Sequence, residues 1–400
     1  MILGIQFAII RLVVIALAVL VQIYLFVRIR QAIKSSLRSN RFKSRAICLV
    51  GTIIGLLFVL NGYILVRPIP WIDPPLAVQL FLFDPPAIWT FGSIFSALFL
   101  FLIQLGGKLG QMIIRLYRNY LNHQTVSIPV NLSRRRFIHA GVVGITTAPL
   151  ILSGYGAAYA SKAYDVEELT LPFGYPLRVV QLTDIHAGIY MTPKEIRRYA
   201  EQVIALQPDV FVLTGDFISN SISFLPSCLE EMAIVHARYG TFATLGNHEH
   251  WFGNLSEFRM IFKQYSIQLL QNSHQLIQTE HGAFAVAGID DLRTGHPNLS
   301  AALRGLDSVI PTLLLSHRPE IFPQAVAHGI PLTLAGHYHG GQIKLSLPGG
   351  DISLAHLVTP YPEGLYRMNV SYLYVSRGIG TTFTPIRLNS PPEVTLFHLT

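Results

Sequence analysis

The feature that most constrains this 400-residue chain is a series of long apolar stretches before residue 160. Three cover roughly Leu12 to Val27, Ile47 to Val66 and Ile88 to Leu105, each near or slightly below the ~20 residues that a membrane-spanning helix needs. A fourth runs from Phe137 to about Ala160. Because 51% of the residues are hydrophobic and only 13% are charged, part of the chain is expected to lie in a bilayer. We therefore expect an N-terminal all-α transmembrane bundle, with three helices in residues 1–131 and a fourth in residues 132–160.

The basic residues predict how this bundle is oriented. Residues 1–160 hold 15 Lys and Arg and 2 Asp and Glu, whereas residues 161–400 hold 15 and 20. Lys and Arg crowd the connection after the first apolar stretch and the connection before the fourth, but the connection between the second and third has none after Arg67. Since Lys and Arg are retained on the cytoplasmic side, the N-terminus and everything after residue 160 are predicted to lie outside the cytoplasm.

The fourth stretch begins with SRRRF, residues 133–137, which resembles the twin-arginine address of exported bacterial proteins. Two interpretations stay open: the cluster anchors an ordinary fourth spanning helix, or it directs export of a domain that has already folded. AYA at residues 158–160 also resembles a small-residue cleavage site. The predicted location is the bacterial cytoplasmic (inner) membrane, with the C-terminal domain on the periplasmic or extracellular side.

A different pattern begins at Pro176, where short β-branched or apolar runs alternate with helical patterns and predict an α/β domain over residues 176–400. Residues 161–175, rich in Glu and turn residues, are expected to be a linker. Between the first two runs, Thr192 to Glu195 predicts a capping box with Pro at the first helical position. The helix should be amphipathic, with one face formed by Ile196, Tyr199, Ala200, Val203 and Ile204.

Five of the apolar runs lead into residues that can bind a metal ion. PLRVVQLT leads into Asp184 and His186, DVFVLT into Asp216, GTFATL into Asn247 and His248, PTLLLS into His317, and PLTLA into His337 and His339. Because ligands of open α/β sheets gather beyond the carboxyl ends of strands, these loops are expected to converge. If the chain stays extended after the first run, Asp184 and His186 point toward one site. Carboxylate, imidazole and carboxamide groups without a thiolate favour hydrolysis by a pair of divalent metals.

In this order the motifs D-x-H, G-D, G-N-H-E, H and G-H-x-H resemble those of the calcineurin-like metallophosphoesterases. QLTDIHAG, LGNHEHW, LLSHRPE and LAGHYHGGQ are similar to the membrane-associated branch of that family, the phosphodiesterases of the YkuE and YaeI type, and to the transmembrane protein with metallophosphoesterase domain. The resemblance covers about residues 165–400. It implies two mixed β-sheets packed as a sandwich and flanked by helices.

The resemblance also implies a ligand set and a reaction. One metal ion would be held by Asp184, His186 and His339, the other by Asn247, His317 and His337, with Asp216 bridging the two. The ions would be divalent, and Mn, Fe and Zn all suit these ligands. A hydroxide formed from water at the metals would attack phosphorus while His248 assists the leaving group. The implied function is a membrane-anchored phosphodiesterase that hydrolyses a phosphodiester or pyrophosphate bond in a lipid-linked or cell-envelope substrate.

Some features depart from the family pattern or stay open. Ser219 stands where many relatives have the second Asp of G-D-x-x-D, so a partner of the metal ligands is expected to differ. His250 is an extra imidazole, for which a structural or substrate-edge role is favoured. Three arginines are left open as phosphate clamps or structural residues: Arg318, Arg377 and Arg387.

Two other functions compete with this prediction. A nuclease of the same fold should carry a basic face, and the net charge of −5 after residue 160 argues against nucleic acid as a partner. A non-catalytic membrane scaffold or sensor should have lost a ligand or His248, and neither is missing. The sequence leaves the oligomeric state open.

Overall fold

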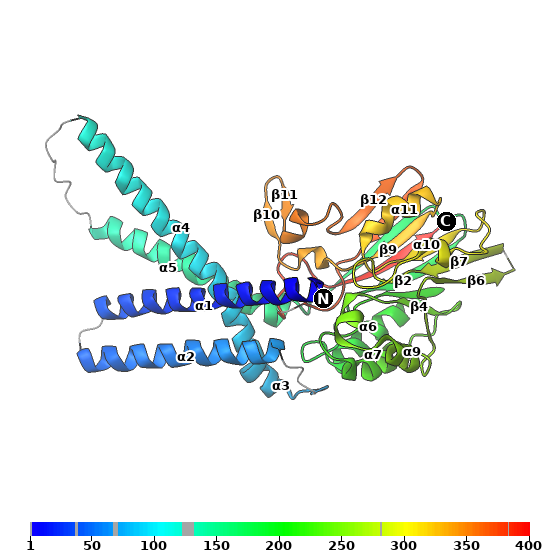
Figure 1. Cartoon of the computed structure of the whole chain (residues 1–400), viewed down its shortest axis with the longest axis horizontal. Coiled ribbons are helices and arrows are strands. Elements are labelled where there is room, and N and C mark those ends of the chain that lie inside the picture. Colours follow the sequence, from blue (N-terminus) through cyan, green and yellow to red (C-terminus); the bar gives the residue numbers. More distant parts are fainter. Residues whose placement is uncertain (1, 37–38, 67–70, 122–131, 281, 383) are drawn as a thin grey trace. The chain divides into compact units, whose positions relative to one another are not determined.

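The computed structural model describes residues 2–36, 39–66, 71–121, 132–280, 282–382 and 384–400 (Figure 1). The chain divides into two compact units. The first contains Met1–Val66 and Phe81–Tyr155, and the second contains Arg67–Leu80 and Gly156–Thr400. The first unit is helical and the second combines helices with β-sheets.

Four long helices make up most of the first unit. They are α1 (Ile2–Ser36), α2 (Asn40–Val66), α4 (Asp84–Leu121) and α5 (Leu132–Tyr155). The short α3 (Leu76–Val78), which belongs to the second unit, and the π-helical turn η1 (Gln79–Phe83) precede α4 along the chain. Four described segments are long and apolar enough to cross a membrane: Ile15–Ser35, Asn40–Ile64, Leu76–Tyr117 and Ala140–Ala160. The prediction of four long apolar helices is thus confirmed.

The helices differ in detail from the predicted stretches. α4 continues to Leu121, well beyond the apolar run that ends at Leu105. α5 runs directly into a second π-helical turn, η2 (Gly156–Ala160). Residues 133–137 lie in the first turns of α5, and their side chains are outside the described part of the chain, as are residues 122–131 between α4 and α5.

Polar side chains join the helices of the first unit internally. Gln22 of α1 is buried, donates to Ser93 Oγ of α4 at 2.9 Å, and accepts from Trp89 Nε1 at 2.9 Å. Such interhelical hydrogen bonds contribute about 0.6 kcal/mol on average in membrane proteins. Elsewhere these helices expose large apolar side chains, including Leu56, Val59 and Ile151, as helices in contact with lipid do.

Two six-stranded mixed sheets form the second unit. The first contains, in order, β1 (Asp165–Leu171), β14 (Glu393–Leu399), β2 (Leu177–Leu182), β3 (Val210–Thr214), β4 (Thr241–Thr244) and β5 (Ile267–Leu269). The second contains β12 (Gly364–Met368), β13 (Ser371–Val375), β9 (Leu332–Ala335), β8 (Thr312–Leu315), β7 (Gly282–Gly288) and β6 (Ser273–Thr279). Five of these strands coincide with the predicted apolar runs.

The sheets pack face to face with helices outside. Val210 and Val212 of β3 join Leu313 of β8 in one buried core between the sheets. Because side chains alternate along a strand, Phe211 and Leu213 face the opposite way and pack with the helices. The helices of this unit are α6 (Pro193–Ala205), α7 (Leu225–Met232), α8 (Asn247–Phe252), α9 (Leu255–Phe262), α10 (Leu299–Ala302) and α11 (Phe322–Ala327), with 3-10 turns η3 (Ile222–Phe224) and η4 (Pro319–Ile321). The predicted sandwich flanked by helices is confirmed.

Three local predictions require correction. Thr192 precedes α6, but its side chain makes no cap hydrogen bond, so Pro193 begins the helix without the predicted capping box. Ile204 is exposed, because at 3.6 residues per turn it lies about 80° around the helix from the buried Ile196. The expected linker 161–175 contains β1, which pairs in parallel with β14 from Asp165 to Leu171 and is therefore part of the sheet.

Candidate metal centre

The loops after five strands bring the predicted site residues together. β2, β3 and β4 are parallel neighbours in one sheet, and β8 and β9 are parallel neighbours in the other. Their carboxyl ends therefore deliver their loops to the same edge of the sandwich. The residues that meet there are Asp184, His186, Asp216, Asn247, His248, His317, His337 and His339, the complete predicted set.

The first group of potential metal-binding atoms comes from the loops after β2 and β9. His186 Nε2 lies 3.2 Å from His339 Nε2, and Asp184 Oδ1 lies 3.4 Å from His339 Nε2. All three residues are buried. Thr382 was not predicted from the sequence, yet its Oγ1 lies 3.1 Å from His186 Nε2 and 2.9 Å from His339 Nε2.

The second group comes from the loops after β4, β8 and β9. His317 Nε2 is at its centre, 3.1 Å from His337 Nδ1 and 3.2 Å from Asn247 Oδ1. Asp216 Oδ2 lies 3.3 Å from the same His317 nitrogen and 3.7 Å from His186 Nε2 of the first group. A single carboxylate oxygen thus lies between the two groups.

These atoms fit divalent metal ions by their chemistry, and among the described residues one of the carboxylate oxygens lacks a hydrogen-bond donor. Asp184 Oδ1 is buried and, within the described part of the chain, accepts no hydrogen bond. A buried carboxylate oxygen without a partner is costly in free energy unless a cation or a donor faces it. The two Nε2 atoms that face each other in the first group likewise need a proton or a cation between them. Nitrogen and oxygen donors without sulfur suit Mn, Fe or Zn.

Burial and Asp216 set the charges of the imidazoles in the metal-free chain. Burial lowers the pKa of His186 to about 3 and that of His339 to about 3, so both are neutral, the form that binds a metal. Burial also opposes a charge on His317, but the carboxylate of Asp216 outweighs it and raises the His317 pKa to about 10. Burial likewise opposes ionisation of Asp216, yet His317 holds the Asp216 pKa well below its usual range.

The backbone at this edge is left-handed at most of the predicted ligands. φ is +52° at Asp184, +50° at His186, +54° at Asp216, +77° at His337 and +52° at His339. Residues other than glycine adopt this region at a cost of about 1–2 kcal/mol each. The prediction of an extended chain from Asp184 to His186 is therefore wrong, although both side chains do reach one site.

Glycines let these loops approach one another. A Cβ at Gly246 would lie 2.2 Å from Asp216 Oδ1, and a Cβ at Gly336 would lie 2.3 Å from Asp184 Oδ2. Both distances are far below any real contact, so neither position accepts a larger residue without displacing a predicted ligand.

Glu249 lies beside the site, and the sequence pattern did not predict a role for it. Its carboxylate is fully buried and accepts hydrogen bonds from the backbone N–H groups of Asp216 (3.0 Å), Phe217 (2.8 Å) and Gly246 (2.7 Å). Burial raises the pKa of Glu249 to about 7, with Asp216 as a further cause. The only sequence signal was its place as the fourth residue of G-N-H-E.

His248 lies beside the two groups and is oriented by the loop after β3. Its Nδ1 is 2.6 Å from the backbone oxygen of Ser219, which can only accept, so Nδ1 carries the proton and donates it. Its Nε2 lies 3.9 Å from Asp216 Oδ2. Ser219, which stands in place of the second Asp of G-D-x-x-D, thus supplies a backbone oxygen as the partner of the His248 ring.

The three arginines that the sequence left open differ in environment. Arg318 is buried in the second group, where Nε donates to Asp291 Oδ1 at 2.9 Å and Nη2 to Asn247 Oδ1 at 3.1 Å. Arg387 is fully buried and donates mainly to backbone oxygens, including that of Ser390 at 2.9 Å, although its Nη2 also lies 3.2 Å from His339 Nδ1. Arg377 pairs with acidic residues, of which Glu393 is closest at 2.7 Å. Arg318 is thus the one best placed beside a substrate.

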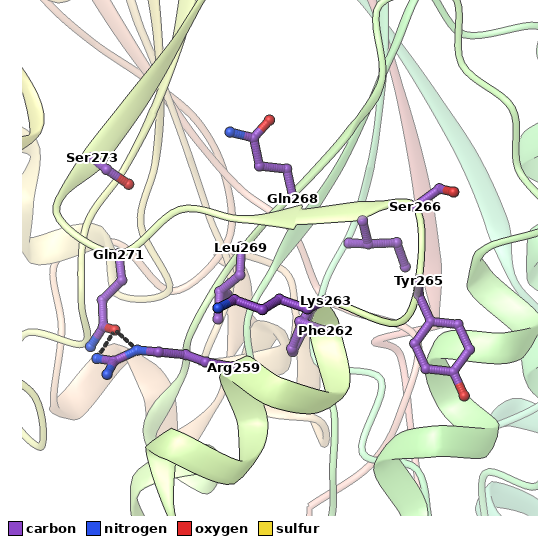
Figure 2. Close-up of a pocket in the computed structure, with 10 residues that line it drawn as sticks. Arg259, Phe262, Lys263, Tyr265, Ser266, Gln268, Leu269, Gln271 and Ser273 are labelled. Carbon is purple, nitrogen blue, oxygen red and sulfur yellow. Dashed lines mark hydrogen bonds between the residues drawn. The ribbon is translucent and has the colours of Figure 1, made fainter.

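His250 and a separate hollow lie outside the two groups. His250 Nε2 is 2.8 Å from Asp290 Oδ1, which agrees with the structural role favoured for it. The hollow is lined by residues of α9, β5 and the segment after it, where Arg259 Nε donates to Gln271 Oε1 at 3.0 Å (Figure 2). None of the predicted ligands lines it, so it is not the metal centre.

Known proteins resemble this chain over the region that carries the site. The calcineurin-like phosphoesterase family matches residues 177–341, which include all eight predicted site residues. Metallophosphoesterase YkuE of Bacillus subtilis (strain 168) is 27% identical over 286 residues, 67% of this chain and 98% of that protein. Metallophosphoesterase YkoQ of the same organism is 31% identical over 235 residues, 57% of this chain and 85% of that protein.

Another relative is named as a transmembrane protein. The transmembrane protein with metallophosphoesterase domain of Danio rerio is 31% identical over 265 residues, or 61% of this chain. The chain spans 59% of that protein, so the similarity covers only part of it.

Proposed function

Because the chain belongs to the calcineurin-like phosphoesterase family, we propose that it is a membrane-anchored phosphodiesterase that uses two divalent metal ions. One observation carries the proposal: Asp216 Oδ2 lies between His186 of one group of metal-binding atoms and His317 of the other. A shared carboxylate between two sets of nitrogen and oxygen donors suits a two-metal site. The four apolar helices support attachment to a membrane.

The proposed ligands follow the two groups. Asp184, His186 and His339 would hold one ion, and Asn247, His317 and His337 the other, with Asp216 bridging. When bound, a pair of divalent ions neutralises phosphate oxygens and makes water a stronger nucleophile near neutral pH.

The chain's own residues would orient the substrate and move a proton. His248 Nδ1 donates to the Ser219 carbonyl, so in the imidazolium form, with both ring nitrogens protonated, Nε2 would give its proton to the leaving-group oxygen and leave a neutral ring. The Arg318 guanidinium, held by Asp291, would neutralise a non-bridging phosphate oxygen. Thr382 Oγ1, beside His186 and His339, would hydrogen-bond to water or phosphate at the other side of the site.

The proposed substrate is a phosphodiester or pyrophosphate in a membrane lipid or another cell-envelope molecule. Attachment to a membrane supports this, since an enzyme held at a bilayer meets such molecules at high local concentration. The basic connections support a catalytic unit on the periplasmic or extracellular side. Replacement of both Arg134 and Arg135 by Lys tests whether the twin-arginine stretch directs export of the catalytic unit or only anchors the helix.

The full-length chain in lipid nanodiscs tests the proposed reaction. After chelation and reloading with Mn²⁺, it should hydrolyse bis(p-nitrophenyl) phosphate faster than p-nitrophenyl phosphate. Asp216→Ala should abolish this activity, whereas Asp307→Asn, at an exposed carboxylate, should leave it unchanged. Undiminished activity after exhaustive chelation, or a preference for the monoester, would contradict the proposal.

A further inference from the structure

An exposed apolar hairpin follows the metal-binding histidines. It consists of β10 (Leu345–Leu347), β11 (Gly350–Ile352) and the 3-10 turn η6 (Leu354–Leu357), and we call residues 345–358 the apolar hairpin. Six of its large aliphatic side chains are between 50% and 78% exposed: Leu345, Leu347, Ile352, Leu354, Leu357 and Val358. Single exposed apolar residues are ordinary, but a contiguous set of this kind marks an interaction surface.

The apolar hairpin belongs to neither six-stranded sheet. Among the described strands, β10 and β11 pair with each other alone, in a two-stranded sheet that is visible beside the sandwich in Figure 1. Its one carboxylate, that of Asp351, lies 3.7 Å from Nζ of Lys344, the residue directly before the apolar hairpin, and that amine is closer to Glu363, at 2.7 Å. The His356 ring is bound to Ser353 Oγ at 2.9 Å. The exposed surface of the apolar hairpin is therefore dominated by aliphatic side chains, with Asp351 as its carboxylate.

The base of the apolar hairpin is attached to the metal centre. It follows the 3-10 turn η5 (His339–Gly341) after only three residues. A Cβ at Gly341 would lie 2.2 Å from Ser353 Oγ, so η5 and the apolar hairpin are in close contact. The Lys344 N–H donates to Leu388 O at 2.9 Å, which fixes the start of the apolar hairpin on the segment 386–388.

The same segment 386–388 contacts the end of a candidate membrane span. Gly156, in the span Ala140–Ala160, accepts from the Arg387 N–H at 3.4 Å. A Cβ at Gly156 would lie 2.6 Å from Ile386 Cγ2, so these two segments of the chain are in contact. Arg387 also reaches His339, with Nη2 3.2 Å from Nδ1. The end of the span, the base of the apolar hairpin and a predicted metal ligand therefore meet at three consecutive residues.

We propose that the apolar hairpin inserts its aliphatic side chains into the surface of the bilayer that the chain's own helices cross. The span that ends at residue 160 supports lipid as the occupant, because it brings this part of the catalytic unit to the membrane surface. Aliphatic side chains on a surface element bind the boundary between headgroups and acyl chains. His339 is then held at the level of the lipid phosphates. The second part of the inference, delivery of a lipid phosphodiester to the metals, rests on the proposed function.

Fluorescent labelling tests the contact without any need for activity. In a Cys48→Ser, Cys228→Ala background, a fluorophore is attached to Leu354→Cys or Leu357→Cys and, as a matched control, to Val309→Cys, an exposed valine outside the apolar hairpin. The full chain is reconstituted in phosphatidylcholine–phosphatidylglycerol vesicles that contain brominated lipid. The hairpin labels should be quenched at least about threefold more than the label at 309, as insertion at the headgroup boundary requires.

Two results would overturn the contact. Equal quenching at 354 and 309 would place the apolar hairpin in water. Concentration-dependent shielding of the 354 label in lipid-free detergent would instead identify a second copy of the chain as the occupant.

Kinetics test the delivery of lipid. For the double variant Leu354→Ser, Leu357→Ser, the ratio of the rate on a vesicle-borne phosphodiester to the rate on a soluble aryl phosphodiester should fall about tenfold, because surface binding is weakened. Val309→Ser should keep the wild-type ratio. An unchanged ratio in the double variant would contradict delivery by the apolar hairpin. If no form of the protein hydrolyses either substrate, the proposed function fails, whereas the quenching result still decides the contact.

Discussion

The backbone N–H of Asp216 donates a hydrogen bond of 3.0 Å to the buried carboxylate of Glu249. The same carboxylate accepts from Gly246, so it joins the loop after β3 to the loop after β4. Asp216 and Asn247, two proposed ligands, lie on these two loops. Glu249 is therefore a positioning residue: it holds ligands in place without lying among the metal-binding atoms.

Glu249→Gln is expected to weaken metal binding about 10- to 100-fold, the usual effect of losing a partner of metal ligands. The amide nitrogen of Gln cannot accept, so at least one buried backbone N–H would lose its acceptor, at a cost of about 1–3 kcal/mol. Calorimetric titration of the metal-stripped full chain with Mn²⁺ measures the affinity. Glu257→Gln, at an exposed position on α9, is the matched control. Wild-type affinity in Glu249→Gln would refute the positioning role.

Asp216→Ala should reduce metal content more than any other single ligand substitution. One carboxylate is proposed to serve both ions, and without it two cations repel each other across a gap of roughly 3.5–4 Å. Metal analysis of the purified variant should find one ion per chain or fewer, against two in the wild type. Retention of both ions would show that the bridge is misassigned.

His248→Ala should keep wild-type metal content and lose activity in a way that depends on the leaving group. A general acid is worth about 10²–10⁴-fold where the leaving oxygen needs a proton, as an alkoxide does. With nitrophenolate, which is stable as an anion, the loss should be much smaller. Equal losses on both substrates would favour positioning of the transition state, and loss of bound metal would make His248 a ligand.

Ser219→Ala serves as the control for the orientation of that ring. His248 is bound to the Ser219 backbone oxygen, which the substitution retains. Activity and its dependence on the leaving group should therefore stay close to wild type.

His250→Gln should destabilise the catalytic unit in a pH-dependent manner. Burial opposes charging of His250, but Asp290 outweighs it and raises the His250 pKa, so this contribution is present below about pH 6.5 and is lost as pH rises through the folded-state pKa. The Asp290 pKa is lowered, so its contribution is present above about pH 3.9 and is lost as pH falls further.

The difference in free energy of unfolding between wild type and His250→Gln should thus be largest between about pH 4 and 6.5. Hydrogen exchange of peptides from residues 177–400 of the full chain, at pH 5.5 and 8.5, measures it locally. A difference of the same size at both pH values would show that the His250–Asp290 contact acts without charge.

The sequence predicts the site residues better than the backbone that presents them. Strand ends could be predicted because runs such as VFVLT are short, apolar and followed at once by Gly215 and Asp216. The left-handed conformation of Asp184 and His186 could not, because it depends on loop closure against other strands. The loops do converge as predicted, but Asp184 and His186 reach the site through left-handed backbone and not through the extended chain that was expected.

Glu249 and the apolar hairpin escaped prediction for a related reason. Glu249 binds the backbone of Asp216 and Phe217, more than 30 positions earlier, and backbone N–H groups leave no trace in residue identity. The run from Leu345 to Val358 is apolar enough to be taken for core, and only the fold leaves it exposed. Pairings of distant segments decide both features.

The left-handed backbone at Asp184, His186, Asp216, His337 and His339 also has an evolutionary consequence. Glycine would relieve the unfavourable φ at each of these positions, so selection for stability alone favours loss of the ligand there. A descendant freed from metal chemistry would drift toward glycine or asparagine at these positions and become more stable. The five side chains thus stand at these positions at a cost in folding free energy, which the proposed metal binding would offset.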